Sequence, residues 1–175
     1  LTACGGGGGG GGGGGSSGTT ATPSLTISGV AATGAAISGG AVDVSCQAGT
    51  GAATTNADGT YTVSVSGGQQ PCILRATDPV TQQQLHSFVE TGATTANITP
   101  ISDLVVANTL GTDPAAAYSN FSAAVQQQIT ASNISAAVTK VQAATAALGT
   151  SADMSGIDPM KGTLQAATSN AAGDA

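Results

Sequence analysis

The sequence has few of the side chains from which most binding and catalytic sites are built. Among 175 residues there are three basic side chains, one histidine, two tyrosines, two phenylalanines and no tryptophan. Three basic residues cannot neutralise a phosphate backbone, which argues against nucleic acid as a partner. So few aromatic rings leave little surface on which bases can stack. No apolar run reaches the roughly 20 residues of a membrane-spanning helix.

The reactive side chains that are present form no recognisable catalytic motif. His86 is the only base for a Ser-His-Asp triad, and it lies in an alternating stretch typical of a strand surface. The sequence contains no G-x-S-x-G elbow, no phosphate-binding loop and no cluster of His and Cys with metal-ligand spacing. We therefore predict a protein that is not an enzyme and holds no metal or cofactor. An enzyme with a pocket around His86 is the alternative.

The N-terminal stretch Leu1-Thr2-Ala3-Cys4 precedes a long run of glycine. It resembles the lipobox of bacterial lipoproteins, in which small residues lead to the Cys that becomes the new N-terminus. The resemblance implies a signal peptide upstream of Leu1 and lipid on Cys4, which would attach the protein to a membrane. Gly rather than Asp after the Cys implies the outer membrane. A free thiol in an unstructured tail is the alternative.

Residues 1–23 have almost no apolar side chains after Cys4 and are dominated by Gly5 to Gly15. Glycine loses more conformational freedom on ordering than any other residue, so this composition predicts a flexible tether. A flexible chain of about 18 residues spans about 23 Å on average. The other interpretation is that oligoglycine strands from several subunits pack together in a fibre.

Residues 24–98 alternate between apolar and polar side chains in short runs separated by turn residues. Strands are expected at 24–30, 41–46, 60–65, 72–77, 84–89 and 94–98. A spacing of about 10 residues between strands is typical of a β-sandwich. The sequence therefore predicts an antiparallel β-sandwich of the immunoglobulin or prealbumin type.

Asp58-Gly59 lies between two alternating runs. This pair is a strong hairpin signal, because Gly supplies a positive φ without a steric cost. A calcium loop also begins with alternating Asp and Asn, but no Glu follows at its closing position. We therefore interpret Asp58 and Gly59 as a turn and predict a hairpin around them.

Two stretches carry a resemblance to a known domain family. Gly34 to Val44, with its V-D-V strand, and Thr54 to Val63, with T-N-A-D-G-T-Y, resemble the carboxypeptidase-regulatory-like or transthyretin-like domain. That family implies a prealbumin-like sandwich used as a non-catalytic module on bacterial surface proteins. Pro71 to Ala76 and Ala96 to Leu104 add a similarity to uncharacterised proteobacterial lipoproteins.

Cys46 and Cys72 lie on two of the expected strands. Export would place them in an oxidising compartment, where a disulfide is expected to form. A metal pair or a redox pair is the alternative, although the sequence has no C-x-x-C spacing and one histidine. We predict a disulfide.

Residues 99–175 show helical spacing of apolar residues with Pro or Ser at the helix starts. Helices are expected to begin at Thr99-Pro100, Asp113-Pro114, Ser132 and Asp158-Pro159. The apolar positions on these helices are Ile101, Leu104, Val105 and Leu110; Tyr118, Phe121, Val125 and Ile129; Ile134, Val138, Val141 and Leu148; Met160, Leu164 and Ala167. Gly111 and Gly149 are expected to end two of them.

The predicted organisation is α+β: a tether over 1–23, a β-sandwich over 24–98 and a helical extension over 99–175, which could be a truncated part of a longer one. We expect a surface-anchored lipoprotein of the cell envelope, surface-exposed or periplasmic, which serves as a scaffold or binding module. Its partners would be the membrane, through the lipid, and a protein or polysaccharide surface. A self-associating subunit of an extracellular fibre or matrix, joined through sheet edges or the glycine run, is the alternative.

Overall fold

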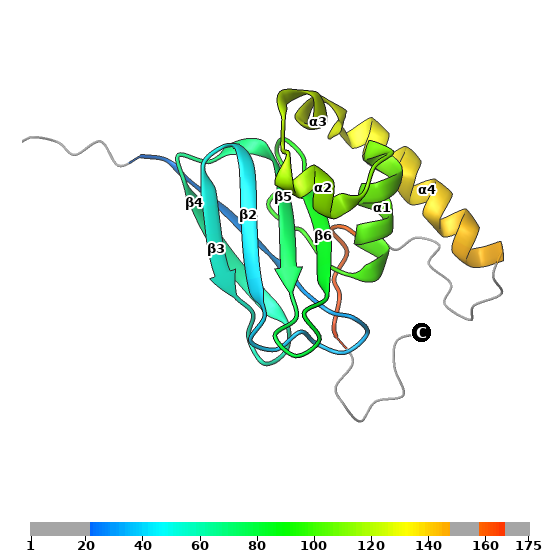
Figure 1. Cartoon of the computed structure of the whole chain (residues 1–175), viewed down its shortest axis with the longest axis horizontal. Helices are drawn as coiled ribbons and strands as arrows, with labels where there is room; N and C mark the ends of the chain where they lie inside the picture. The colour runs from blue at the N-terminus through cyan, green and yellow to red at the C-terminus, as the bar shows by residue number, and fades with distance from the viewer. Residues whose placement is uncertain (1–21, 148–157, 167–175) are drawn as a thin grey trace, which may run out of the picture.

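The computed structural model describes residues 22–147 and 158–166 of the chain (Figure 1). The predicted tether, Cys4 included, lies outside the described residues except for Thr22 and Pro23. The fold is mixed α+β, with two antiparallel sheets followed by four helices. The elements are β1 Ser24–Val30, β2 Ala41–Ala48, β3 Thr50–Thr54, β4 Thr60–Ser66, β5 Gln69–Thr77, β6 Gln84–Val89, α1 Pro100–Leu110, α2 Pro114–Ser119, α3 Ala123–Gln128 and α4 Ala131–Ala147.

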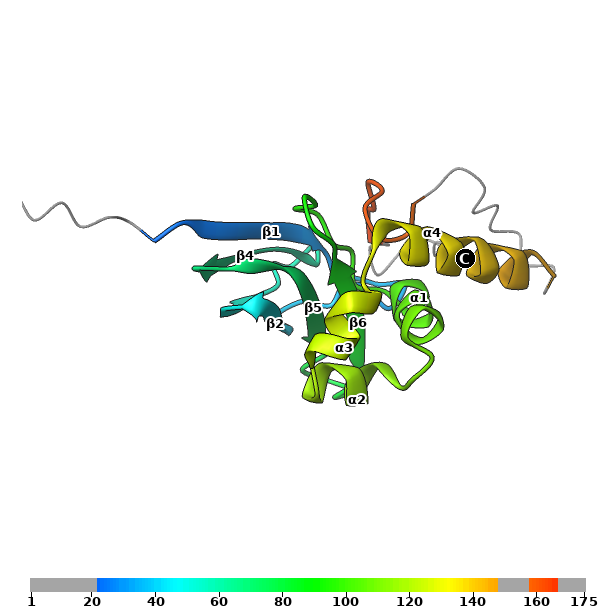
Figure 2. The same cartoon turned by 90° about the horizontal axis from the view of Figure 1, so that it is seen from above.

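The strands divide between a two-stranded sheet, β1-β4, and a four-stranded sheet in the order β3-β2-β5-β6. The two sheets lie in separate layers, and the helices form a further layer beyond β5 and β6 (Figure 2). Five of the six expected strands are present, and β3 is an additional one. β3 escaped the prediction because its Thr-Gly-Ala-Ala-Thr sequence has no large apolar side chain to mark an alternation.

The inner core lies between the two sheets and is made of the alternate side chains that face inward from each strand. Most of these side chains are small aliphatic ones, with Tyr61 as the largest. The buried strand residues of this core are Ile27, Val42, Val44, Cys46, Tyr61, Val63, Val65, Cys72, Leu74, Ala76, Leu85 and Val89. Alternation along β2 and β4 therefore places Val42, Val44 and Cys46, and Tyr61, Val63 and Val65, on the buried face of each strand.

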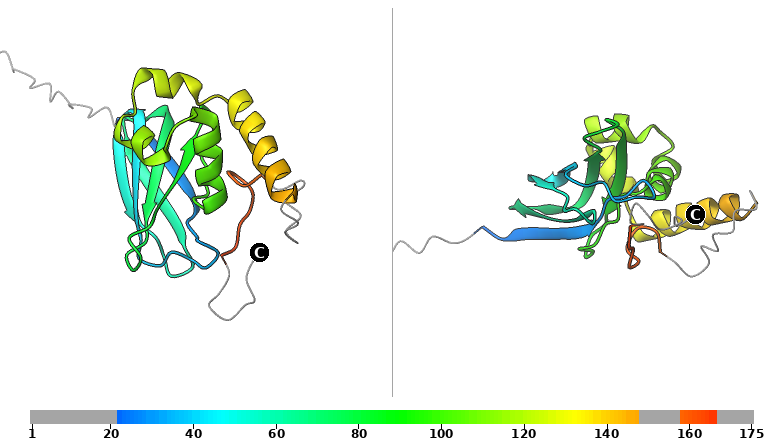
Figure 3. Two further views of the ribbon diagram at one scale, coloured as in Figure 1. Left: turned by 45° about the vertical axis from the view of Figure 1, so that its right-hand side comes forward. Right: turned by 90° about the horizontal axis from the view of Figure 1, so that it is seen from below.

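A second core lies on the opposite face of β5 and β6, under the helices. Ile73 and Phe88 supply the sheet side of this core, and Val105 and Val106 of α1 are completely buried against it. α4 packs beside α1 and adds Ile134 to the same core (Figure 3). β5 and β6 are therefore covered on both faces.

Two of the four predicted helix starts are found where the sequence signals placed them. Thr99 is the N-cap of α1, with Pro100 at its first position and Gly111 as a left-handed C-cap at φ 63°. Asp113 is the N-cap of α2, where its Oδ1 accepts the N–H of Ala116 at 3.0 Å. Short polar residues before Pro thus identify both boundaries.

Several features of the helical half differ from the prediction. The single periodic stretch after Asp113 forms two short helices, α2 and α3, separated at Asn120 to Ser122. α4 begins at Ala131, one residue before the predicted cap. On α1, Leu104 is 49% exposed while Val106 is buried, because both the sheet and α4 contact this helix and its buried side is wider than a single stripe.

No helix follows Asp158 in the described segment 158–166. Asp158 instead closes a turn, accepting the N–H of Met160 at 2.9 Å through its side chain and that of Gly162 at 2.7 Å through its carbonyl. Met160 is buried in the second core. The helix predicted to carry Met160 and Leu164 does not form, because this segment is a turn that places Met160 in the second core. Three further predicted positions, Leu148, Gly149 and Ala167, lie outside the described residues.

The strand predicted at 94–98 is not present as a strand. Two isolated parallel bridges, Ser28 to Thr95 and Ala31 to Ile98, join this segment to the end of β1. Its regular pairing is interrupted because the backbone N–H of Asn97 is donated to Met160 at 2.8 Å instead of to a neighbouring strand. The segment is thus an irregular border along β1.

Tyr61 ties this border to the inner core. Its side chain is 2% exposed, and its hydroxyl donates to the carbonyl of Ala96 at 2.5 Å. Burial raises the pKa of Tyr61 well above its usual value near 10. Gly29 leaves room for this contact, since a Cβ there would lie 1.8 Å from the Ala96 carbonyl oxygen.

The buried phenol of Tyr61 predicts a loss of stability in alkali. Because its pKa is raised in the folded state, its contribution is complete below about pH 10 and is lost as the pH rises further and the unfolded chain ionises. Tyr61→Phe is expected to lower the free energy of unfolding by about 1–2 kcal/mol at neutral pH and to flatten its decline above pH 10. Urea unfolding between pH 7 and 11.5 measures both; an unchanged alkaline slope in the variant would contradict the assignment.

Candidate functional site

Cys46 and Cys72 form a disulfide between β2 and β5, with an Sγ–Sγ distance of 2.01 Å. The two residues are directly opposite each other in the antiparallel ladder, and both face the inner core. The disulfide prediction is therefore confirmed. The bond joins the two central strands of the four-stranded sheet, so it closes a loop across the middle of the fold.

Asp58 and Gly59 form the predicted turn. Gly59 has a φ of 79°, and the Asp58 carboxylate accepts the N–H and the hydroxyl of Thr60 at 3.0 and 2.6 Å. The Thr60 hydroxyl, followed by its N–H, lowers the pKa of Asp58 below its usual value. The hairpin prediction is wrong, because β3 and β4 on either side of the turn belong to different sheets.

A row of polar side chains crosses the outer face of the four-stranded sheet. Asp43 on β2 is opposite Arg75 on β5, and Arg75 is opposite His86 on β6. Arg75 Nη2 lies 2.7 Å from Asp43 Oδ2, and the guanidinium stacks over the Tyr118 ring of α2 at 4.5 Å from its centroid. We refer to Asp43, Arg75, His86, Asp103 and Tyr118 as the His86 network.

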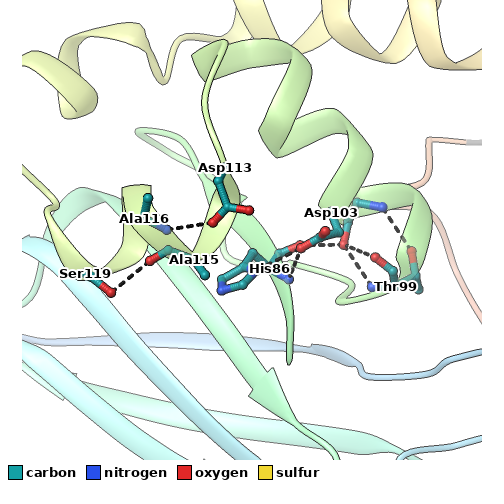
Figure 4. A network of polar contacts seen from close by, with 8 residues as sticks. His86, Thr99, Asp103, Asp113, Ala115, Ala116 and Ser119 are labelled. Carbon is teal, nitrogen blue, oxygen red and sulfur yellow. Dashed lines mark hydrogen bonds and ion pairs between the residues drawn. The ribbon is translucent and has the colours of Figure 1, made fainter. Parts of the chain in front are cut away.

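The centre of the His86 network is a contact between β6 and the first turn of α1 (Figure 4). Asp103 Oδ1 lies 2.8 Å from His86 Nδ1 and also accepts the backbone N–H of His86 at 2.9 Å. Ser102 Oγ donates to the carbonyl of His86 at 2.7 Å. Both outward backbone groups of this strand residue are therefore satisfied by side chains of the helix.

The arrangement around His86 is suited to holding the helix on the sheet. An ionised carboxylate only accepts, so Asp103 places the ring proton on Nδ1. In a catalytic triad the nucleophile would donate a hydrogen bond to His86 Nε2. This nitrogen is buried and has no hydrogen-bond partner among the described residues. His86 is 2% exposed, so the prediction of a surface histidine is wrong. A single alternating strand does not reveal that helices cover its second face.

Tyr118 lies at the rim of the network. Its ring centroid is 6.1 Å from that of His86. Partial burial raises the pKa of Tyr118, the charge of Asp43 raises it further, and the charge of Arg75 opposes both. The Tyr118 ring thus lies against the Arg75 guanidinium and close to the His86 ring.

A second candidate is an open cleft of about 360 Å³ between the first half of α4 and the turn at Asp158. Its walls combine Ile134 and Val138 with polar side chains, and an ion pair between Glu90 and Lys161 crosses one end. The remaining lining residues are Ala131, Ser135, Thr139, Gln142 and Asp158. The cleft has both apolar and polar walls, and its charged lining residues are Glu90, Asp158 and Lys161.

Residues 22–147 and 158–166 contain no group of three or more His, Cys, Asp or Glu side chains that could hold a metal ion. None of the helices in this part of the chain is both long and apolar enough to cross a membrane.

The chain matches no known protein family, and no curated protein or solved structure is significantly similar to it.

Removing the Asp103 carboxylate is expected to loosen the helical layer. Asp103→Ala leaves the buried N–H and Nδ1–H of His86 without an acceptor, which predicts a loss of about 2 kcal/mol in the free energy of unfolding. Asn108→Ala, an exposed change on the same helix, is the matched control and is expected to have little effect. Chemical denaturation measures both, and an Asp103 variant as stable as the control would contradict this role.

Opening the disulfide is expected to destabilise the whole domain. Cys46 and Cys72 are 26 residues apart, and closing a loop of that length stabilises the folded state by about 3.5 kcal/mol on the chain-entropy model. The double variant Cys46→Ala/Cys72→Ala should lose this amount in urea unfolding, and reductant should have the same effect on the unchanged chain. Cys4→Ser is the control and should unfold with the unchanged midpoint.

Proposed function

We propose that this protein is a membrane-tethered, non-catalytic module of the bacterial cell envelope that presents its folded domain to a protein or polysaccharide surface. The observation that carries the proposal is the disulfide between Cys46 and Cys72 in the inner core. Structural disulfides persist in oxidising compartments and are rare in reducing ones. A domain that depends on such a bond for its central sheet is suited to work after export.

The N-terminal sequence supports attachment to a membrane. Leu1-Thr2-Ala3-Cys4 has the small-residue pattern of a lipobox, and the run from Gly5 to Gly15 supplies a linker that keeps a domain away from the bilayer. Several acyl chains on Cys4 would anchor the protein firmly, since each buried CH₂ contributes about 0.8 kcal/mol. The lipid is thus the proposed anchor and the glycine run the proposed spacer.

The proposed type of fold is a prealbumin-like β-sandwich with an added helical layer. The support is that β1-β4 and β3-β2-β5-β6 are both antiparallel and share the inner core. The T-x-x-D-G-x-Y sequence of residues 55–61, on which the resemblance to the transthyretin-like family depends, forms the turn from β3 to β4, although the hairpin that the resemblance implies is absent. The resemblance implies a non-catalytic module of a bacterial surface protein.

A role without catalysis is supported by the use of the ionisable groups. Arg75 is paired with Asp43 and stacked on Tyr118, and Asp103 is occupied by His86. These contacts fasten the helices to the sheet and make the domain rigid. A rigid body on a long linker fits a scaffold or a binding module.

Lipid attachment at Cys4 is the direct test of the proposal. The chain fused behind a lipoprotein signal peptide, expressed in a Gram-negative host grown with labelled palmitate, is expected to carry the label and to sediment with the outer membrane. Cys4→Ser should abolish the label and release the domain into a soluble fraction. Mass spectrometry of the N-terminal peptide identifies the acyl groups.

Alkylation of the same extracts separates the two parts of the proposal. Cys46 and Cys72 should resist alkylation until reductant is added, in both the unchanged chain and the Cys4→Ser variant. Labelled palmitate absent from Cys4 would overturn the membrane tether alone. Free thiols at Cys46 and Cys72 in freshly made extracts would overturn export to an oxidising compartment.

A further inference from the structure

The two sheets have four edges, and contacts among residues 22–147 and 158–166 cover β6, β4 and the second half of β1. At β6, the outward N–H and C=O of His86 are bonded to Asp103 and Ser102 of α1, which lies along this strand. At β1, Ser28 donates to Thr94 at 3.0 Å and accepts from Ala96 at 2.9 Å. Exposed strand edges invite pairing with another chain, and these contacts protect two of them.

The edge of β4 is covered by β3. A Cβ added at Gly51 would lie 3.0 Å from the carbonyl oxygen of Ser64, and one added at Gly49 would lie 3.0 Å from that of Ser66. The two glycines therefore let the backbone of the β3 hairpin approach the open side of β4. This close contact leaves no room for another strand beside β4.

The outer edge of β3 has no such cover. The N–H of Thr55 is donated to Gly40, and the N–H of Cys46 to Gly49, which fixes the alternation of hydrogen-bonded pairs between β2 and β3. By that alternation the N–H and C=O groups of residues 50, 52 and 54 point away from β2. None of the described residues bonds to them, and β3 lies at the margin of its sheet (Figure 1).

β3 also lacks the features that block pairing at an edge. Its sequence, Thr-Gly-Ala-Ala-Thr, contains no charged residue and no proline. The side chains of Thr50, Ala52 and Thr54 are exposed and small, so they do not hinder an approaching strand. The edge is thus available to an extended strand of another molecule.

We propose that β3 is a pairing surface for a second copy of this chain. Two β3 strands placed antiparallel about a two-fold axis at Ala52 put residue 50 opposite residue 54 of the second copy, and residue 52 opposite itself. All three outward-facing residues then fall on hydrogen-bonded pairs, which gives about six N–H···O=C bonds. The result is a continuous sheet in the order β6-β5-β2-β3-β3-β2-β5-β6.

The chemistry of the strand favours a second copy as the partner. The edge is self-complementary, because its donors and acceptors recur at every second residue on both sides of Ala52. Thr50 would face Thr54 of the second copy, a cross-strand pair that is favourable on a sheet surface. The nearest charge, Asp43 on β2, is already paired with Arg75 at 2.7 Å.

The net charge of −6 does not oppose this pairing locally. The Asp43 side chains of the two copies would be separated by three strand spacings, which is about 14 Å. This distance exceeds the Debye length of about 8 Å at physiological ionic strength, so their repulsion is screened. The inference goes beyond the proposed function and holds whether or not Cys4 carries lipid.

Sedimentation velocity of the purified full chain over a series of concentrations tests the inference. The chain carries Cys4→Ser, which removes a free thiol as a route to dimers. A reversible monomer–dimer equilibrium is expected. Thr50→Lys/Thr54→Lys places like charges opposite each other at both ends of the paired strands and should weaken the dimer at least about 10-fold. Gln84→Lys/Gln127→Lys adds the same charge at exposed positions on other elements and should leave the dimer unchanged.

Charge exchange then identifies the strand. Thr50→Glu/Thr54→Glu should weaken the dimer alone in the same way, while an equimolar mixture of the Lys and Glu variants should restore it, because each Lys then faces a Glu. Thermal unfolding checks that both variants are folded as stably as the control. A chain that stays monomeric at all concentrations, a Lys variant that dimerises as well as the control, or a mixture that stays monomeric would overturn the proposal.

Discussion

The first turn of α1 is the contact on which the arrangement of sheet and helices depends. Thr99 and Ser102 cap each other's backbone N–H groups, and Ser102 also donates to the carbonyl of His86. Asp103, the next residue, accepts two donors of His86. Ser102 therefore helps to begin the helix, and together with Asp103 it satisfies the outward backbone groups of His86. Buried backbone groups left unpaired are costly, so the position of α1 along β6 follows from this turn.

The second core becomes possible once α1 is fixed in this way. Phe88 follows His86 on the same face of β6 and meets Val105 and Val106 of α1. α4 can then pack on α1, and Met160 completes the layer from the turn at Asp158. A chain with few large side chains thus places most of its larger apolar residues into two thin cores that share β5 and β6.

The inner core depends on close approach and cross-linking more than on bulk. Gly29 admits the Tyr61 hydroxyl and the border segment, and Gly51 admits the edge of β4. The disulfide between Cys46 and Cys72 stabilises the pairing of β2 with β5 at the centre of the larger sheet. Small side chains, glycines and one covalent bond together replace the large hydrophobic residues that a domain of this size usually contains.

Local signals in the sequence predicted the parts of the fold that depend on local physics. Alternation located β1 and β6 to the residue, and the pairs Thr99-Pro100 and Asp113-Pro114 located two helix starts. The parts that were missed depend on the tertiary environment. The burial of His86 requires a second layer that one strand cannot reveal, and β3 is held by its neighbours without apolar side chains of its own.

The candidate site shows the same division. The pairing of Cys46 with Cys72 was predictable, since two strands of matching phase carried the only two cysteines outside the tether. The role of Asp103 was only half visible. Its place in a first helical turn was clear, but its acceptance of a histidine 17 residues earlier is set by the packing of α1 on β6. The Asp58-Gly59 turn was predicted, but its position between two sheets was not. The residues that form a turn are the same whichever sheet the following strand joins.

The uneven protection of the sheet edges limits how large an assembly built by strand addition could become. Pairing through β3 alone gives each copy a valence of one, because each copy presents a single β3 edge. Such growth terminates at a closed pair, and a longer polymer would require a second kind of contact elsewhere on the chain. Two tethered copies joined in this way would also share their attachment to one surface, so that release of either would require both anchors to detach.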